Sequence, residues 1–219
     1  MKRIIDLSYT IESNMPNYSI LPVVKIEKIR TIEENGDNVT TIFVPSHGGT
    51  HIDAPIHQVD GGLTIDKLSV ERFIGDAIML DVSYKYNSED IVITLADIEK
   101  YKDKVKDGDI VVLNTGCHEH QDEFKKFGYI DSEVASWFVK KNIKLLAVDT
   151  PSVDLNVPSG EKMPVHQIIL GAGIPIIEGL TNLGNINNER FLFVGFPLKI
   201  KDGDGSPCRV VAIEGVEKL

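Results

Sequence analysis

The sequence predicts a single-domain sandwich of strands and helices, in the α/β or α+β class. Predicted strands outnumber predicted helices, and the strands occur both in antiparallel-looking clusters and in units where a helix joins two strands. The chain has no internal repeat, low-complexity tract or linker. We therefore expect one domain over residues 1–219, and its 42% hydrophobic residues suffice for a core.

The first half of the chain supplies four predicted strands and one helix. The strands are runs rich in β-branched or apolar residues, at 23–32, 39–44, 77–82 and 109–113. The sequence Thr94-Leu95-Ala96-Asp97 resembles a capping box, which predicts a helix from there to about Val105. Residues 35–37 are predicted to form an ordinary turn.

The second half adds two helices and four strands. Helices are predicted over 132–141 and, after Pro164, over 164–170. The strands are the short apolar runs 144–148, 175–178, 191–195 and 209–213. Residues 202–206 are predicted to form a second ordinary turn. The order of the strands in the sheet does not follow from these patterns.

Charge and cysteine content exclude several classes of function. The net charge of -10 argues against a nucleic-acid surface, because binding a polyanion needs clustered Lys and Arg; a small-molecule substrate is expected instead. The two cysteines, Cys117 and Cys208, lie far apart without a Cys-rich framework, so we expect no disulfide and a reducing, cytoplasmic environment.

No membrane segment is expected either. Acidic and polar residues interrupt the N-terminal segment, so it does not resemble a signal peptide. The most apolar later stretch, 168–177, contains Gly171, Gly173 and Pro175 and is much shorter than the roughly 20 residues that span a bilayer.

The chemistry is concentrated in the segment His47-Gly48-Gly49-Thr50-His51-Ile52-Asp53-Ala54-Pro55-Ile56-His57. Its three histidines and its aspartate have odd numbers, so in an extended chain their side chains point to the same face. A helix would turn His51 and Asp53 about 200° apart, and the two glycines and the proline disfavour one. We predict an extended or looped segment with converging polar groups.

Three imidazoles and one carboxylate are ligands that zinc, manganese or iron prefers. One loop histidine alone is more often merely solvated, but four such groups on one face indicate a metal site. A further cluster, Cys117-His118-Glu119-His120, lies in a polar stretch, and we interpret it as a solvated loop that borders the substrate pocket rather than as a metal site.

The segment 47–57 resembles the hallmark His-x-Gly-Thr-His-x-Asp-x-Pro-x-His of the cyclase-like metal hydrolases, the family of bacterial kynurenine formamidases and isatin hydrolases. The resemblance extends over most of the chain, through Ile5-Asp6-Leu7-Ser8, Asp149-Thr150-Pro151-Ser152-Val153-Asp154, His166, Ile176-Ile177-Glu178-Gly179-Leu180 and Pro197-Leu198-Lys199. It implies a single-domain swivelling β/β/α-type sandwich.

The formamidase branch of this family holds two metal ions side by side, so the resemblance implies two Zn²⁺ ions per subunit here, with Mn²⁺ as the alternative. Its implied ligands are His47 and His51 for the first ion, His166 for the second, and Asp53 and Glu178 as bridges. Physical reasoning supports this in part, since bridging carboxylates offset the repulsion between two cations. Without the resemblance, His166 is more readily interpreted as a core or surface histidine than as a ligand. Glu178, at the end of an apolar run, is costly to bury unless paired or metal-bound.

The resemblance implies hydrolysis of an amide C–N bond, with N-formylkynurenine as the expected substrate and formate and kynurenine as products. His57 is the implied proton donor and acceptor. Relatives carry a substrate-stacking Trp where this chain reads Met15-Pro16-Asn17-Tyr18, so Tyr18 is the candidate substrate contact.

Three alternatives stay open: an isatin hydrolase-like enzyme that opens a cyclic amide, a metal-dependent dehydratase or cyclase, and a metal- or small-molecule-binding module without turnover. The presence of His57 speaks against the last, because binding needs no proton shuttle. The resemblance also implies a homodimer or homotetramer, with N-terminal residues reaching a neighbour's pocket.

Overall fold

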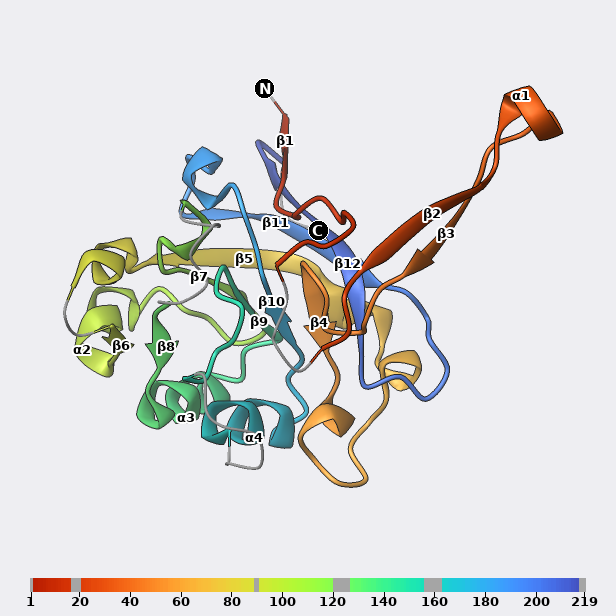
Figure 1. The fold of residues 1–219 in the computed structure, drawn as a ribbon. Helices are drawn as coiled ribbons and strands as arrows, with labels where there is room; N and C mark the ends of the chain where they lie inside the picture. The colour runs from red at the N-terminus through yellow and green to blue at the C-terminus, as the bar shows by residue number, and fades with distance from the viewer. Residues whose placement is uncertain (1, 17–20, 89–90, 120–126, 156–162, 217–219) are drawn as a thin grey trace.

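The computed structural model of the protein contains one large sheet that closes into a ring (Figure 1). The structure describes residues 2–16, 21–88, 91–119, 127–155 and 163–216. The eight strands run in the order β1-β12-β11-β5-β7-β9-β10-β4, and β4 also pairs with β12, so seven of them form a closed, barrel-like ring. No helix in the described ranges is long and apolar enough to cross a membrane.

The ring joins a parallel half to an antiparallel half. The neighbours β5-β7-β9-β10 run parallel, and every other pairing in the ring is antiparallel. The strands are β1 (Arg3–Asp6), β4 (His51–Asp53), β5 (Ile74–Asp81), β7 (Ile110–Asn114), β9 (Leu145–Val148), β10 (Ile176–Glu178), β11 (Arg190–Pro197) and β12 (Gly205–Glu214). Strand β1 lies along β12 beyond the end of β4, so these two short strands share one edge of β12.

Two hydrophobic cores flank the parallel strands. In β7, Val111 and Leu113 belong to the core between sheet and helices, whereas Ile110 and Val112 belong to the core inside the ring. The strands β5, β9 and β10 divide their residues in the same way, as expected when successive side chains point to opposite faces. Because both faces of these strands are buried, their sequences are continuous apolar runs.

Helices cover the outer face of the parallel strands. They are α2 (Leu95–Ile98), α3 (Ser132–Lys140) and α4 (Pro164–Gly171), and α3 and α4 pack against each other. The predicted capping box is confirmed, because the Thr94 hydroxyl accepts the Asp97 backbone N–H and the Asp97 carboxylate accepts the Thr94 backbone N–H. The expected length is wrong: the α-helix ends at Ile98 and a 3-10 turn follows. That turn places Ile98 and Tyr101, both buried, on one side.

A two-stranded arm projects from this body. It consists of β2 (Lys25–Arg30) and β3 (Val39–Phe43), with the short helix α1 (Ile32–Asn35) at its tip (Figure 1). The predicted turn at 35–37 follows this helix, with Gly36 in the left-handed region. The sequence patterns identified both strands of the arm but missed β1 and the short parallel pair β6 (Val92–Ile93) and β8 (Tyr129–Ile130).

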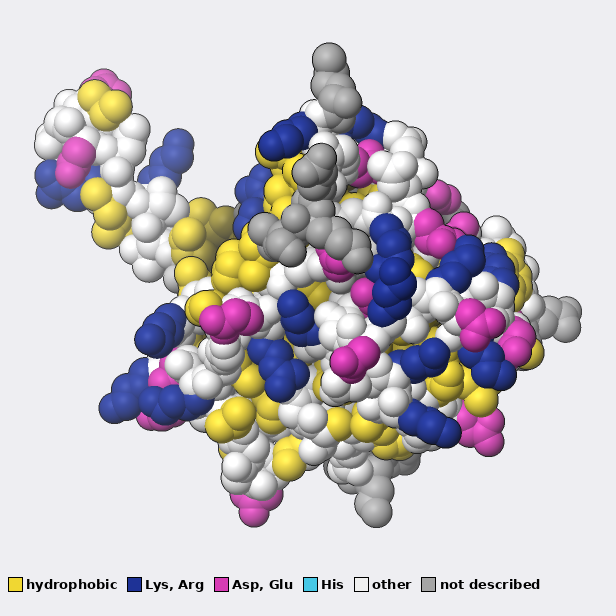
Figure 2. Space-filling model, turned by 180° about the vertical axis from the view of Figure 1, so that it is seen from behind, with side chains coloured by type: hydrophobic (Ala, Val, Ile, Leu, Met, Phe, Trp, Pro, Cys, Tyr) yellow, Lys and Arg dark blue, Asp and Glu magenta, His cyan; other side chains and the backbone are white. Residues whose placement is uncertain are grey.

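Most of the arm is exposed to solvent, including its apolar residues. Ile29, Ile32, Ile42 and Phe43 are each more than half exposed. Figure 2 shows hydrophobic side chains along the arm and where it joins the body. A two-stranded hairpin without a packed face is marginally stable in water.

Candidate metal centre

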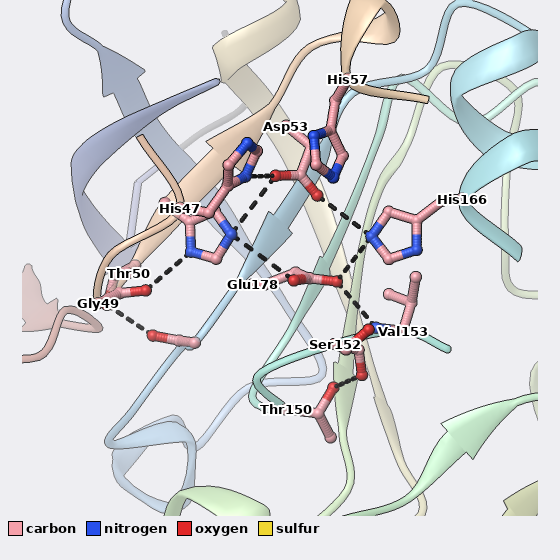
Figure 3. A network of polar contacts seen from close by, with 12 residues as sticks. His47, Gly49, Thr50, Asp53, His57, Thr150, Ser152, Val153, His166 and Glu178 are labelled. Atoms are coloured by element: carbon pink, nitrogen blue, oxygen red, sulfur yellow. Dashed lines mark hydrogen bonds and ion pairs between the residues drawn. The ribbon is translucent and has the colours of Figure 1, made fainter. Parts of the chain in front are cut away.

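Five elements bring the predicted ligands together (Figure 3). Strand β4 carries His51 and Asp53 on one face, since they are two residues apart. Antiparallel pairing places Glu178, the last residue of β10, opposite His51. His166 comes from the first turns of α4. His47 precedes β4, and His57 ends the 3-10 turn Pro55–His57. The predicted extended or looped segment is therefore a strand at β4 and a tight turn at His57.

Two buried carboxylates form the centre of the cluster. The Asp53 Oδ1 atom lies 3.4 Å from His51 Nε2, and Asp53 Oδ2 lies 3.4 Å from His166 Nε2. Glu178 repeats this arrangement, with Oε2 at 3.6 Å from His51 Nε2 and Oε1 at 3.3 Å from His166 Nε2. Each carboxylate therefore faces both histidines, one oxygen to each, as the bridging role requires.

These separations suit a cation better than direct hydrogen bonds. Two ligand atoms about 2.1 Å from a tetrahedral ion lie about 3.4 Å from each other. Asp53 Oδ2 is buried and has no hydrogen-bond partner among the described residues, an arrangement that is costly without a compensating group. Two groups of ligand-type atoms each lie within 4.8 Å of one another. One group comes from His51, Asp53 and Glu178, and the other from His47, Asp53 and His57. The donor set fits a divalent metal.

The second nitrogen of each ligand histidine faces a fixed acceptor. His51 Nδ1 lies 2.9 Å from the Gly49 carbonyl oxygen, and His166 Nδ1 lies 2.7 Å from Asp154 Oδ2. His47 Nδ1 faces Asp53 Oδ1 at 2.7 Å, which leaves its Nε2 3.0 Å from Asp204 Oδ2. An acceptor of this kind keeps the proton on the outer nitrogen, so the inner nitrogen keeps a lone pair that can bind a metal.

Two of these acceptors have roles that sequence patterns did not reveal. Asp154 also accepts the backbone N–H groups of Val165 and His166, both at 3.0 Å, so it fixes the start of α4 together with its histidine. Asp204 lies in 202–206, which we had predicted to be an ordinary turn. A turn is present at residues 201–202, where the Gly203 N–H donates to the Ile200 carbonyl, but β12 already begins at Gly205 and Asp204 contacts His47.

Two glycines allow the close packing of this cluster. Gly179 has a φ of +69°, and a Cβ atom there would lie 2.8 Å from the Gly49 carbonyl oxygen. A Cβ atom on Gly205 would lie 2.9 Å from His47 Cε1. Both distances are too short for a side chain, so the loop that carries His47 can approach β10 and β12 only at glycine.

The electrostatics of the cluster favour a bound cation. Burial lowers the pKa of His47, but Asp53 and Asp204 outweigh it and raise that pKa to about 10. Burial raises the pKa of Asp53, yet His47, His166 and His51 together hold it well below its ordinary value. The Asp53 carboxylate therefore remains ionised and attracts positive charge, whether from protons on histidines or from metal.

His57 lies beside the predicted ligands without a close carboxylate contact. Its ring centroid is 4.0 Å from that of His47 and 5.8 Å from that of His166. Burial and its two histidine neighbours lower the pKa of His57 to about 4, although Asp53 opposes this. A neutral imidazole at neutral pH can accept a proton. Tyr18, the predicted substrate contact, lies outside the described residues.

The segment Cys117–Glu119 is not a solvated loop, so that part of our interpretation is wrong. Cys117 and His118 are buried. Asp149 Oδ1 accepts hydrogen bonds from Thr115 N and Oγ1, and Asp149 Oδ2 accepts one from His118 N. This buried carboxylate anchors the segment at the end of β7. His120 lies outside the described residues.

The sequence was compared with known families and proteins. The model of the family described as putative cyclase matches residues 5–155, more than half of the chain. The chain belongs to this family. A kynurenine formamidase from Bacillus cereus is 30% identical over 210 residues, covering 94% of this chain and 95% of that protein. A kynurenine formamidase from Erythrobacter litoralis is 28% identical and covers 97% and 94%.

Solved structures of cyclase-family proteins share the fold. Isatin hydrolase A from Ralstonia solanacearum superposes with a TM-score of 0.87 at 23% identity, covering 97% of this chain and 92% of that one. A structure described as a predicted metal-dependent hydrolase from Bacillus stearothermophilus has a TM-score of 0.81 at 26% identity and covers 98% and 99%. The expected family and its single-domain α/β fold are confirmed.

Proposed function

We propose that the protein is a metal-dependent hydrolase of amide C–N bonds, and that it acts as an arylformamidase on N-formylkynurenine to give formate and kynurenine. The observation that carries this proposal is the pair of carboxylates, Asp53 and Glu178, each of which faces both His51 and His166. The relatives named kynurenine formamidase, which match nearly the whole chain, support the substrate.

The metal would be held by His47, His51 and His166 with Asp53 and Glu178 between them. We propose two Zn²⁺ ions, with Mn²⁺ as the alternative, because the two carboxylates offer oxygens to two separate groups of histidines. When bound, the metal supplies a Lewis acid that activates water and polarises the amide carbonyl. The protein's own contribution is a rigid frame, since the acceptors behind each histidine fix its orientation.

His57 would transfer the proton in this reaction. Its imidazole takes a proton from the attacking water and delivers it to the leaving nitrogen, because an amine anion is too basic to leave unprotonated. His57 belongs to the 3-10 turn directly after β4, so the strand that carries His51 and Asp53 also places the proton carrier beside them. We further propose that Tyr18 stacks on the aromatic ring of the substrate.

An isatin hydrolase-like activity is the second candidate, supported by the fold shared with isatin hydrolase A. A cyclic amide needs the same polarised carbonyl and the same proton delivery to nitrogen.

A dehydratase or cyclase would use the metal without consuming water, and a binding module would not turn over. Hydrolysis in ¹⁸O-labelled water separates these classes, because only hydrolysis places solvent oxygen in the product.

The decisive experiment is hydrolysis of N-formylkynurenine by the purified protein, stripped of metal and then reloaded with zinc or manganese. Metal-dependent formate release that is lost in His57→Ala supports the arylformamidase. Absence of turnover in the folded, metal-loaded protein contradicts that substrate, and isatin is then the next compound to test.

For assembly, we propose a homodimer or homotetramer in which the exposed arm packs on a second copy. The arm exposes several apolar side chains, among them Ile42 and Phe43, and contact with a second copy would remove them from water. We place the enzyme in the reducing cytoplasm, consistent with the two free cysteines.

A further inference from the structure

Asp204 contacts two functional histidines with the same oxygen atom. Its Oδ2 lies 3.0 Å from His47 Nε2 and 3.9 Å from His57 Nδ1. The first distance is a hydrogen bond, and the second is a longer electrostatic contact. The ring centroids of His47 and His57 lie 4.0 Å apart, and the ring planes are tilted by 39°. One carboxylate can therefore reach a nitrogen of each ring. The acceptors at the Nδ1 atoms of His51 and His166 are different groups, the Gly49 carbonyl and Asp154.

The backbone holds Asp204 firmly although half of its side chain is exposed. Its carbonyl oxygen accepts the N–H of Ala54 at 2.9 Å, the residue that follows Asp53 in the chain. The next residue, Gly205, pairs with Asp53 in the ladder between β12 and β4. On the other side, the Gly203 carbonyl accepts the N–H of Ile65. The strand that presents Asp53 thus also fixes the position of Asp204.

The two contacts have different chemical consequences. A carboxylate at His47 Nε2 keeps the proton there and leaves Nδ1 free to bind metal. The same carboxylate beside His57 Nδ1 favours a proton on Nδ1, which leaves Nε2 as the nitrogen that exchanges protons with water and substrate.

We propose that Asp204 is a positioning residue that orients the metal ligand His47 and the proton carrier His57 together. The part that concerns His57 rests on the proposed hydrolytic function, and the part that concerns His47 does not. Asp204 therefore couples metal binding to proton transfer, although it belongs to neither the ligand set nor the reacting groups.

The test compares Asp204→Asn and Asp204→Ala with Asp202→Asn. The control makes the same chemical change two residues away, at an exposed position whose φ of +56° suits asparagine. Zinc affinity is measured by competition with a chromophoric chelator. Both Asp204 variants should bind zinc about 10- to 100-fold more weakly, the usual effect of losing an acceptor behind a ligand histidine, whereas the control should match the unmodified protein.

A spectroscopic measurement tests both histidines without substrate. Long-range ¹H–¹⁵N spectra of the zinc-loaded protein at neutral pH report which ring nitrogen carries the proton. In the unmodified protein and in the control, we expect the proton of His47 on Nε2 and that of His57 on Nδ1. In Asp204→Asn and Asp204→Ala, both with intact circular dichroism, the His57 proton should shift toward Nε2.

A kinetic measurement then uses formanilide and 4-nitroformanilide at saturating zinc. Proton delivery matters more for the poorer leaving group, so kcat of the Asp204 variants should fall more for formanilide. Equal zinc affinities and equal spectra of Asp204→Asn and Asp202→Asn overturn the proposal. A change at His47 alone, with the His57 proton still on Nδ1, also overturns it. If the unmodified protein hydrolyses neither compound, the proposed function fails, while affinity and spectra still decide the role of Asp204.

Discussion

At the scale of single residues, the site depends on what each of the two ring nitrogens of a histidine contacts. The parity of residues 47, 51, 53 and 57 predicted a common face, and the structure places their polar groups together. The acceptors behind the rings were not predictable in the same way. Gly49 acts through a backbone carbonyl, and Asp204 lies 157 residues from His47 in the chain. A backbone acceptor carries no side-chain signal, and the position of Asp204 is set by tertiary structure, so no local pattern encodes it.

Replacing Asp53 by asparagine should abolish tight metal binding. The amide removes the charge that faces all three ligand histidines, at distances of 2.7 to 3.4 Å. We expect bound zinc after dialysis, measured by mass spectrometry, to fall at least about tenfold, while the exposed control Asp60→Asn retains it. Equal zinc content in both variants would show that Asp53 is not a ligand.

The thiols of buried Cys117 and half-buried Cys208 should react slowly. Burial, with a smaller contribution from Asp149, raises the pKa of Cys117 to about 12, and burial with Asp53 raises the pKa of Cys208. A raised pKa keeps a thiol neutral, so the reactive thiolate is scarce at pH 8 and increases only as the pH approaches that pKa. Titration with Ellman's reagent should detect two thiols in urea and almost none in the native protein. Rapid native reaction would contradict this environment.

At the scale of elements, local signals were sufficient where they act over a few residues. The helix α3, the strands β2 and β3, and the capping box of α2 were all predicted. The end of α2 was not, because the burial of Tyr101 and its hydrogen bond with Asp81 N decide where the chain changes to a 3-10 turn. Strand β1 was also missed, since its four residues are recognisable only beside β12.

Removal of the α2 cap should destabilise the protein. In Thr94→Ala the hydroxyl that bonds Asp97 is lost, which should cost about 1 kcal/mol in the free energy of unfolding. Urea denaturation measures this value. The control Ser136→Ala removes an exposed hydroxyl within α3 and should change the free energy by less than about 0.5 kcal/mol. An equal effect of both changes would argue against the capping box.

The projecting arm should control assembly. The double change Ile42→Thr and Phe43→Thr keeps strand propensity but removes two exposed apolar side chains. Light scattering coupled to size-exclusion chromatography should show the unmodified protein as a dimer or tetramer and the variant shifted to monomer. Val70→Thr, an exposed position on the body, should leave the mass unchanged. An unchanged mass in the arm variant would exclude the arm as the interface.

At the scale of the whole molecule, the sequence indicated the fold class but not its closure. Antiparallel-looking clusters of strands, together with units in which a helix joins two strands, predicted a sandwich of strands and helices. The ring closes because β4, only three residues long, pairs with β10 on one side and β12 on the other. Nothing in His51-Ile52-Asp53 marks it as the closing strand, because the pairing depends on partners more than 120 residues away.

This double pairing makes the ligand strand inseparable from its neighbours. β4 cannot fray from an edge, since opening it requires both ladders to break at once. Hydrogen exchange should therefore show the amides of β4, β10 and β12 exchanging as one cooperative unit with a common opening free energy. A ligand for β4 stabilises that whole unit, so metal loading should slow exchange around the ring, as far as residues of β12 that lie beyond any metal ligand.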